Sequence, residues 1–155
     1  MKSKLIVTLI IVINCFIANA QRYDWAKFCE GSNGGISVTH DHWGNLIMVG
    51  EYSEDLISGS DTLHPYFPGN GSDVYVAKFA YNGTLLWVRG FGGSWYDNVY
   101  SVTTDPVGNI YVTAYVQNPE TYFGDTIVSN PSTKQLVKFN PYGDFKWNKY
   151  FSSQA

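Results

Sequence analysis

The histidines are the first residues of this chain that could do chemistry, and there are three of them. His40 and His42 alternate at the end of an expected strand, a spacing that could present two imidazoles to a metal ion. A repeat within the chain places Thr104 and Pro106 at the matching positions, so the imidazole pair does not recur. We therefore expect His40, His42 and His64 to be solvated turn residues and predict no metal site.

Four aspartates could act as general acids or bases. Asp41 and Asp105 occupy equivalent positions of the repeat, each at the start of an Asp-x-x-Gly segment. An aspartate at the first position of a type I turn accepts hydrogen bonds from backbone N–H groups. We expect Asp41 and Asp105 to stabilise turns, and Asp73 and Asp97 to do similar work where strands begin. No catalytic residue is predicted.

The segment Gly92-Gly93-Ser94 resembles a fragment of a phosphate-binding loop. In a complete P-loop a lysine and a serine or threonine follow the glycines, and a helix begins there. Neither feature follows Ser94. The glycines are instead expected to permit a tight crossover between structural units, and no cofactor is predicted.

Four aromatic residues are expected in loops or at strand ends: Trp43, Trp95, Tyr96 and Tyr66. Exposed rings of this kind stack on sugar rings or anchor a protein partner. Ordinary packing over a neighbouring unit is the alternative, and it is the interpretation that we favour. If the chain binds a ligand, these rings are where we expect it.

One hairpin, Asp73–Gly93, is the element around which these residues are organised. Asp73–Phe79 and Thr84–Phe91 are rich in β-branched and aromatic residues, as expected of strands. The connection Ala80-Tyr81-Asn82-Gly83 resembles Asn140-Pro141-Tyr142-Gly143, where a two-residue type I′ turn would force a positive φ on a tyrosine. A type I turn followed by a left-handed glycine fits both copies, so we predict three-residue loops.

Four blocks of the hairpin and its surroundings recur in constant order. The matches pair Trp25 with Trp87 and Trp147, Ile36–Tyr52 with Tyr100–Tyr115, Asp61–Leu63 with Asp125–Ile127, and Val76–Phe79 with Leu136–Phe139. Each unit should carry four strands, predicted in the second unit at Tyr100–Thr104, Asn109–Tyr115, Gln135–Phe139 and Phe145–Phe151. A repeated four-stranded antiparallel meander is the blade of a β-propeller. We therefore predict an all-β fold with about two complete blades and one extra N-terminal outer strand.

The units resemble the SBBP repeat, a bacterial β-propeller repeat of exported proteins, and are similar in style to the NHL and YVTN repeats. The residues that carry the resemblance are Asp73–Phe79, Gly83, Trp87, Phe91-Gly92-Gly93-Ser94, Asp97, Asp105, Gly108-Asn109 and Tyr111-Val112-Thr113. The first unit departs from the pattern at Glu30–Gly34, and Ala114 replaces the glycine that Gly50 supplies. The resemblance implies a propeller module.

The N-terminal residues 1–20 are typical of a cleavable secretory signal peptide. Lys2 and Lys4 precede an apolar run from Leu5 to Ile13, and Ala18-Asn19-Ala20 ends the segment before Gln21. An uncleaved membrane anchor is the alternative, but the run is short for a membrane span. We therefore expect an exported protein, in the periplasm, at the cell surface or outside the cell. The expected units are a lone outer strand at 21–31 and blades at 32–93 and 94–155.

Charge and cysteine content exclude several classes of protein. Loss of the leader with its two lysines would move the formal net charge from −3 to −5, and no basic stripe is present to bind nucleic acid or a membrane surface. Of the two cysteines, Cys15 leaves with the leader, so Cys29 would have no partner within its chain. Disulfides are therefore not expected to stabilise this protein.

The repeat leaves the ring of the expected propeller incomplete. Propellers close with about four to eight blades. We expect the remaining blades to come from a longer chain or from self-association. The favoured function is a non-enzymatic exported module for ligand or protein binding, for adhesion, or as a surface scaffold. The alternative is a fragment of a propeller lyase or glycosidase whose catalytic residues lie in other blades.

Overall fold

The computed structural model describes residues 30–58, 60–117, 119–129 and 133–151. The strands in these ranges are β1 (Glu30–His40), β2 (Leu46–Ser58), β3 (Asp61–Leu63), β4 (Asp73–Phe79), β5 (Leu85–Phe91), β6 (Asn98–Thr104), β7 (Ile110–Val116), β8 (Glu120–Phe123), β9 (Thr126–Ser129), β10 (Thr133–Phe139) and β11 (Phe145–Tyr150). No helix in the described part of the chain is long and apolar enough to cross a membrane. The predicted leader, and all but the last two residues of the predicted strand at 21–31, lie outside these ranges.

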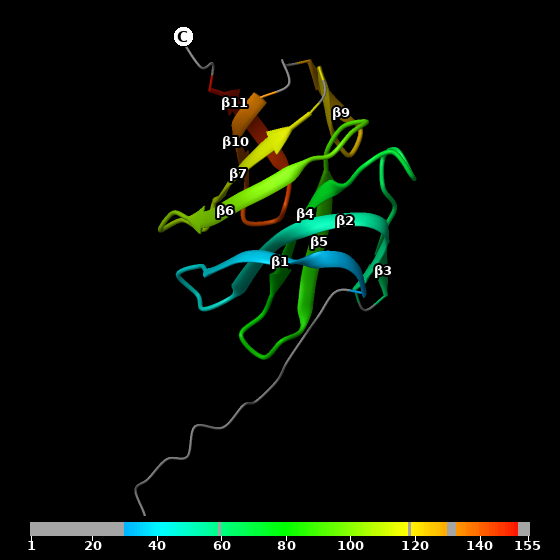
Figure 1. Ribbon diagram of the computed structural model, residues 1–155. Helices are drawn as coiled ribbons and strands as arrows, with labels where there is room; N and C mark the ends of the chain where they lie inside the picture. Colours follow the sequence, from blue (N-terminus) through cyan, green and yellow to red (C-terminus); the bar gives the residue numbers. More distant parts are fainter. Residues whose placement is uncertain (1–29, 59, 118, 130–132, 152–155) are drawn as a thin grey trace, which may run out of the picture.

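The strands form two large antiparallel sheets and the small two-stranded sheet β8–β9, and the large sheets do not close into a ring (Figure 1). The first sheet has the order β1-β2-β4-β5, with β3 paired to the end of β2, and the second has the order β11-β10-β7-β6. In each large sheet the strands pair with their neighbours in the sequence, as in a meander, if the short strand β3 and the β8–β9 hairpin are not counted. The predicted all-β fold of partial propeller blades is confirmed, and the predicted strands of the second unit agree with β6, β7, β10 and β11 within two residues.

The four turns that join neighbouring strands of the two sheets share one geometry. In the β4–β5 turn the Gly83 N–H donates to the Ala80 carbonyl at 2.8 Å, and the Ala80 N–H donates to the Thr84 carbonyl at 2.8 Å. The final glycines have φ near +80° and are Gly44, Gly83, Gly108 and Gly143. No described residue other than glycine has a positive φ. The predicted three-residue loops are therefore confirmed, and Tyr142 avoids strain.

A hairpin that the sequence did not predict lies in the long connection between β7 and β10. The strands β8 and β9 pair antiparallel from Glu120↔Ser129 to Phe123↔Thr126, and Gly124 turns between them with φ +61°. The equivalent residues of the first sheet form the end of β2 and the strand β3. Because Pro119 follows β7, the second copy separates from its long strand and becomes a hairpin of its own.

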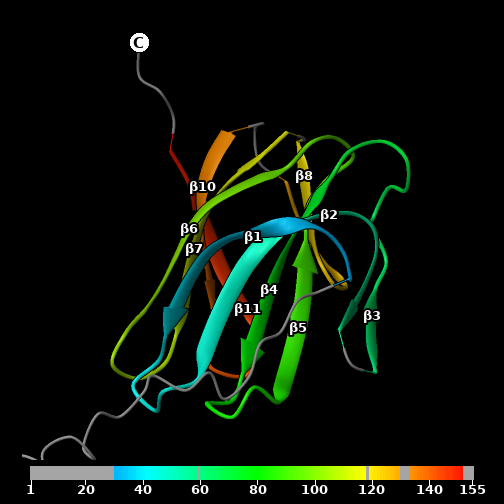
Figure 2. The ribbon, with the colours of Figure 1, turned by 60° about the horizontal axis from the view of Figure 1, so that its bottom comes forward.

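The main core lies between the two sheets. It joins Ile47, Val49, Val76 and Phe91 of the first sheet to residues of the second, among them Val112, Val137 and Phe139. The β8–β9 hairpin adds Phe123, whose ring stacks on Phe145 with the centroids 3.9 Å apart. A second cluster, which includes Tyr52, Tyr75 and Phe79, lies on the far face of the first sheet. In Figure 2 the four glycine turns gather at one end of the two sheets, and this end holds the site described next.

Candidate binding groove at the junction of the two sheets

A buried lysine lies at the centre of the junction. Lys78 is in β4, a strand whose residues are all buried, and it is 4% exposed. Its neighbours across the sheet are Ile47 and Trp87. Its Nζ lies 2.9 Å from the Asp41 Oδ2, and the Asp41 side chain is fully inaccessible. A buried ammonium is costly unless it is paired, so the Asp41 carboxylate is what allows a lysine at this point.

Asp41 combines this ion pair with the turn role that the sequence predicts. Its Oδ1 accepts hydrogen bonds from the backbone N–H groups of Trp43 and Asn45, both at 2.9 Å, and its Oδ2 accepts one from the Asn45 side chain at 2.9 Å. Burial by itself would raise the pKa of this carboxyl. The hydrogen bonds from Asn45 and Lys78 outweigh burial, so the pKa lies below its usual value and the carboxylate stays ionised.

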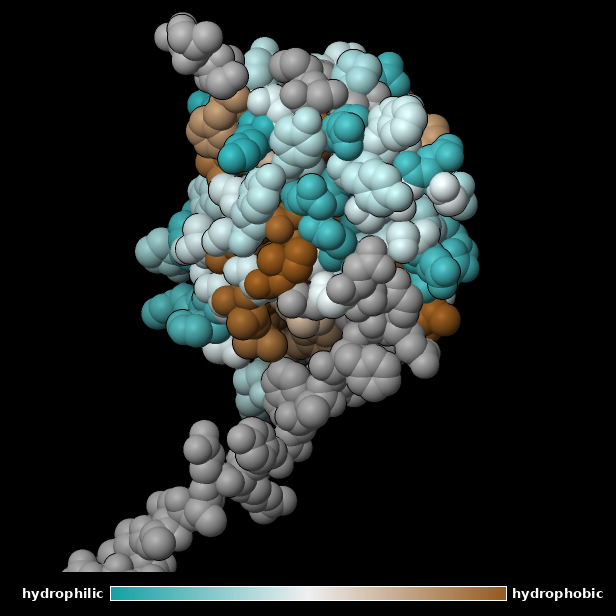
Figure 3. Space-filling model, viewed as in Figure 1, coloured by the Kyte–Doolittle hydropathy of each residue, from teal (hydrophilic) through white to brown (hydrophobic). Residues whose placement is uncertain are grey.

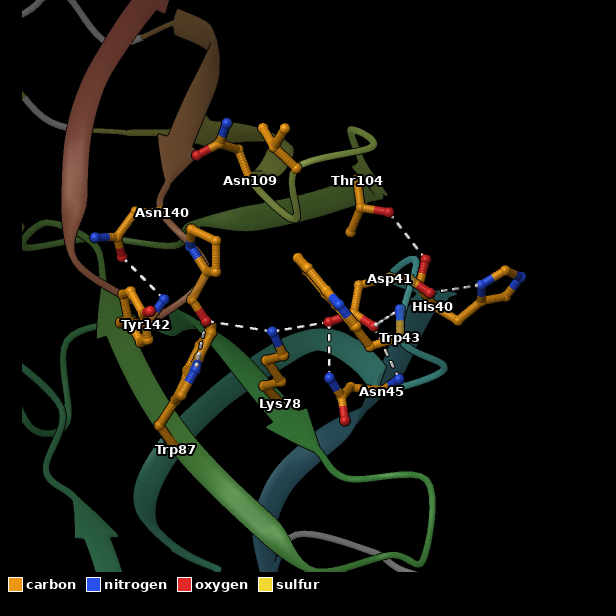
Figure 4. A network of polar contacts seen from close by, with 12 residues as sticks. His40, Asp41, Trp43, Asn45, Lys78, Trp87, Thr104, Asn109, Asn140 and Tyr142 are labelled. Atoms are coloured by element: carbon orange, nitrogen blue, oxygen red, sulfur yellow. Dashed lines mark hydrogen bonds and ion pairs between the residues drawn. The ribbon is translucent and has the colours of Figure 1, made fainter.

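A single backbone carbonyl of the second sheet completes the network. The Lys78 Nζ donates to the Pro141 carbonyl at 3.3 Å, and the Trp87 Nε1 donates to the same oxygen at 3.2 Å. Figure 4 shows Lys78 between the two tryptophan side chains, with hydrogen bonds running to both sides. Pro141 belongs to the β10–β11 turn, so two donors of the first sheet hold the second sheet by one turn.

Two tryptophans of the first sheet pack on the turn glycines of the second. A Cβ on Gly108 would lie 2.5 Å from the Trp43 ring, and one on Gly143 would lie 3.0 Å from the Trp87 ring. Only glycine leaves room for these rings. Trp43 and Trp87 are therefore fixed on either side of a groove of about 520 Å³, which we call the two-tryptophan groove. Its lining is Trp43, Lys78, Leu86, Trp87, Val107, Pro141 and Tyr142.

The two-tryptophan groove offers apolar surface more than reactive groups. Trp43 is 59% exposed and Tyr142 is 76% exposed, so the rim is open to solvent. The lysine at its base is already engaged with Asp41 and the Pro141 carbonyl. A pocket of this volume with aromatic walls is of the size that takes a small ligand or a segment of peptide.

Asp73 and Asp97 form a second buried group of carboxylates, close to Gly92. A Cβ on Gly92 would clash with Asp73 Oδ1 and Asp97 Oδ2. Asp73 accepts from the Tyr66 N–H at 2.7 Å, and Asp97 accepts from the N–H groups of Gly93 and Gln117 at 2.6 and 2.9 Å. Burial raises the pKa of Asp73 to about 6 and that of Asp97 to about 7. Because they are 2% and 0% exposed, no substrate reaches them in this conformation.

The structure separates the four aromatic residues that the sequence singled out. Trp43 lines the two-tryptophan groove. Trp95 and Tyr96 are exposed at the other side of the junction, where Tyr96 lines an acidic pocket of about 670 Å³ with Glu51, Glu54 and Asp55 among its walls. Tyr66 is half-buried, packs against Tyr122 with the ring centroids 5.4 Å apart, and accepts a hydrogen bond from the Gly124 N–H. The four rings do not form one surface.

The histidines lie apart from the groove's donors. His40 is exposed with its Nδ1 3.2 Å from the Asp41 carbonyl, and the exposed His64 Nδ1 lies 2.8 Å from Asp55 Oδ1. Within the described ranges, no three histidine, cysteine, aspartate or glutamate side chains are grouped so that they could hold a metal ion. Gly92 joins the units by pairing with Tyr122 through two backbone hydrogen bonds.

Lys78 is the functional residue that sequence reasoning missed. The repeat contained a signal for it, because a lysine stands in the same place of both apolar strands, as Lys78 in Val-Ala-Lys-Phe and Lys138 in Leu-Val-Lys-Phe. A charge kept inside a strand with apolar neighbours indicates a specific partner. The partner itself, a turn carbonyl 63 residues away in the chain, could not be read from the sequence.

Comparison with known proteins identifies the repeat. Residues 86–115 match the family model of the SBBP beta-propeller repeat. The match runs from β5, through Gly92-Gly93-Ser94 and Asp97, to the end of β7, and so crosses the junction between the two sheets. No curated protein matches the chain. The predicted resemblance is confirmed over these residues, and it agrees with the antiparallel sheets of the structure.

Proposed function

We propose that this β-propeller repeat protein is an exported, non-enzymatic module that binds an extended apolar or proline-containing segment of a partner protein in the two-tryptophan groove. The observation that carries the proposal is an open groove with the exposed Trp43 indole on one side and the Trp87 indole, which is 8% exposed, on the other. Extended proline-rich segments dock in aromatic-lined grooves, and tryptophan is prominent among the residues that dominate binding energy.

The chemistry of the walls supports a peptide over a free sugar. Sugar recognition needs polar groups that are free to bond with several hydroxyls, whereas the polar groups at the base are bonded to one another. Exposed Val107 and Leu86 and half-buried Pro141 add aliphatic surface.

Export is part of the proposal and rests on the N-terminal sequence. The basic start, the short apolar run and Ala18-Asn19-Ala20 support cleavage before Gln21. Mass spectrometry of the protein recovered after expression in a bacterial host is expected to give a chain that begins at Gln21. Recovery of the intact chain in the membrane fraction would contradict it.

Binding is tested by titrating the chain with a synthetic oligoproline and an alternating leucine–proline peptide, followed by tryptophan fluorescence. Trp43→Ala is expected to weaken binding at least tenfold, because it removes one wall of the groove. Trp95→Ala is the matched control, since Trp95 is equally exposed at 57% but does not line the groove. Equal loss in both variants, or saturation by an oligosaccharide in place of the peptides, would overturn the choice of ligand.

A further inference from the structure

The two donors that join the sheets, a lysine and a tryptophan, recur in the second sheet, where no described residue accepts a hydrogen bond from them. In the first sheet Lys78 and Trp87 are paired across β4 and β5, and both donate to the Pro141 carbonyl. In the second sheet Lys138 and Trp147 are paired in the same way across β10 and β11. They lie on the face that points away from the first sheet, which we call the outer face of the second sheet.

The outer face of the second sheet is equivalent in sequence to the face of the first sheet that packs on the second sheet, but some of its apolar residues are replaced by polar ones. Its residues Tyr111, Thr113 and Leu136 stand where the first sheet has Ile47, Val49 and Val76. The Tyr111 and Trp147 rings lie 6.1 Å apart, and the Lys138 Nζ lies 5.2 Å from the Tyr111 ring centroid. Within the described ranges, neither the Lys138 ammonium nor the Trp147 indole N–H has a hydrogen-bond acceptor.

The matching acceptor is present in the first sheet. The β4–β5 turn has the same geometry as the β10–β11 turn, and Tyr81 stands where the latter has Pro141. Tyr81 is 76% exposed. Its carbonyl is therefore the counterpart of the oxygen that Lys78 and Trp87 bind.

The apolar surface beside this turn is also incompletely covered. Val102 and Val112 of the second sheet are buried against the first sheet, at 6% and 0% exposure. Their counterparts on the far face of the first sheet are Val38, which is 58% exposed, and Met48, which is half-buried. Figure 3 shows apolar side chains (brown) at the surface on the side of the molecule where β1 runs in Figure 1.

We propose that a second copy of this chain docks its first sheet on the outer face of the second sheet, with its Tyr81 carbonyl accepting from Lys138 and Trp147. The contact repeats the one already made inside each chain. It is head-to-tail, because the two surfaces are different, and such contacts generate a ring when the rotation closes and an open array when it does not. The surface is distinct from the two-tryptophan groove, so the inference goes beyond the proposed function.

Sedimentation velocity of the purified chain over a wide range of concentration tests the association. The chain is expected to associate, and Trp147→Phe, which keeps a six-membered aromatic ring and removes the indole N–H, is expected to weaken the self-association constant about tenfold. Lys138→Met should do the same. Trp95→Phe is the matched control, because Trp95 is an exposed tryptophan that belongs to no strand of either surface. Tyr81→Pro should retain association, since proline occupies the equivalent turn position.

A photo-crosslinking residue in place of Tyr111 identifies the occupant. Cross-links from one copy to residues of the first sheet of another copy are expected, and mixing isotope-labelled with unlabelled chains distinguishes them from links within a chain. A monomer at every concentration, or association that Trp147→Phe and Trp95→Phe weaken equally, would overturn the inference. Near-ultraviolet circular dichroism of each variant checks that it is folded. A monomer that still binds the peptides would leave the proposed function intact.

Discussion

The two sheets carry the same strand order and the same turns, yet their equivalent lysines have different surroundings. Lys78 is 4% exposed and paired with Asp41, whereas Lys138 is half-buried and lies over the Tyr111 ring. One sequence difference accompanies it, at the position paired with each lysine. The first sheet has Ile47 where the second has Tyr111, whose hydroxyl donates to Asp105 Oδ2 at 3.0 Å.

The comparison shows that the turn aspartate has one structural role and two possible partners. Asp41 and Asp105 accept the same backbone hydrogen bonds and the same asparagine side chain. Where another sheet covers the face, the remaining carboxylate bond goes to a buried lysine. Where no described residue covers the face, the aspartate accepts from the hydroxyl of Tyr111. A tyrosine is neutral and can be exposed to solvent, so no charged partner is needed.

The largest expected difference between the sheets is in the cost of removing each lysine. Lys78→Met leaves the Asp41 carboxylate buried without its ammonium and is expected to lower the free energy of unfolding by about 3 kcal/mol. Lys138→Met removes a contact with an aromatic ring and should cost less than about 1 kcal/mol. Urea denaturation of the two variants measures both values. Equal losses of unfolding free energy in the two variants would show that burying the ion pair of Lys78 does not make this lysine more important for stability than Lys138.

The pH dependence of stability should also differ between the sheets, because the carboxyl groups with raised pKa values belong to the first sheet and to the connection that follows it. Asp73 begins β4, whereas Thr133 occupies the same position in β10. The folded-state pKa values of about 6 for Asp73 and about 7 for Asp97 lie above the ordinary value of 3.8. Between pH 4 and 7 the folded state therefore binds more protons than the unfolded state, and stability falls as the pH rises.

The expected loss between pH 5 and pH 8 is about 4 kcal/mol. Asp41 works in the opposite direction, but only in acid, because its pKa is lowered. Asp97→Asn should flatten the profile, while Asp125→Asn, a change at an exposed carboxyl, should leave it unchanged. Thermal unfolding of the three proteins across this range makes the measurement. A stability that rises toward pH 8 would contradict the assignment.

The smallest expected difference concerns two equivalent turn glycines. Gly44 and Gly108 have φ of +78° and +81°, so alanine at either position is strained by about 1 kcal/mol. Nothing lies within 4 Å of a Cβ at Gly44, whereas a Cβ at Gly108 meets the Trp43 ring. Gly108→Ala should therefore cost about 1 kcal/mol more than Gly44→Ala in urea denaturation. The excess should disappear in a Trp43→Ala background. If it persists, the added Cβ is not destabilising through the Trp43 ring.

The turns and strands could be predicted because their causes are local. A proline or tyrosine that cannot take a positive φ, next to a glycine that can, restricts the choice of turn, and alternation of β-branched and aromatic residues predicts the strands. The hairpin β8–β9 escaped prediction because its strands have four residues each and contain polar side chains. The sequence marks Trp43 as one of four places where a ligand could bind, although ordinary packing is the favoured interpretation, and it marks Trp87 only as a residue of the repeat.

The amino-acid sequence by itself determined the repeat, the strand order within each sheet and the role of the turn aspartates, since these depend on neighbours within a few residues. Only the tertiary structure decided that Lys78 and Trp87 meet the Pro141 carbonyl, that Trp43 lies on Gly108, and that two aspartates are buried with raised pKa values. The contacts with the Pro141 carbonyl join residues 54 and 63 positions apart. Their energies depend on which face of a sheet is covered, and two copies of one pattern cannot reveal that difference.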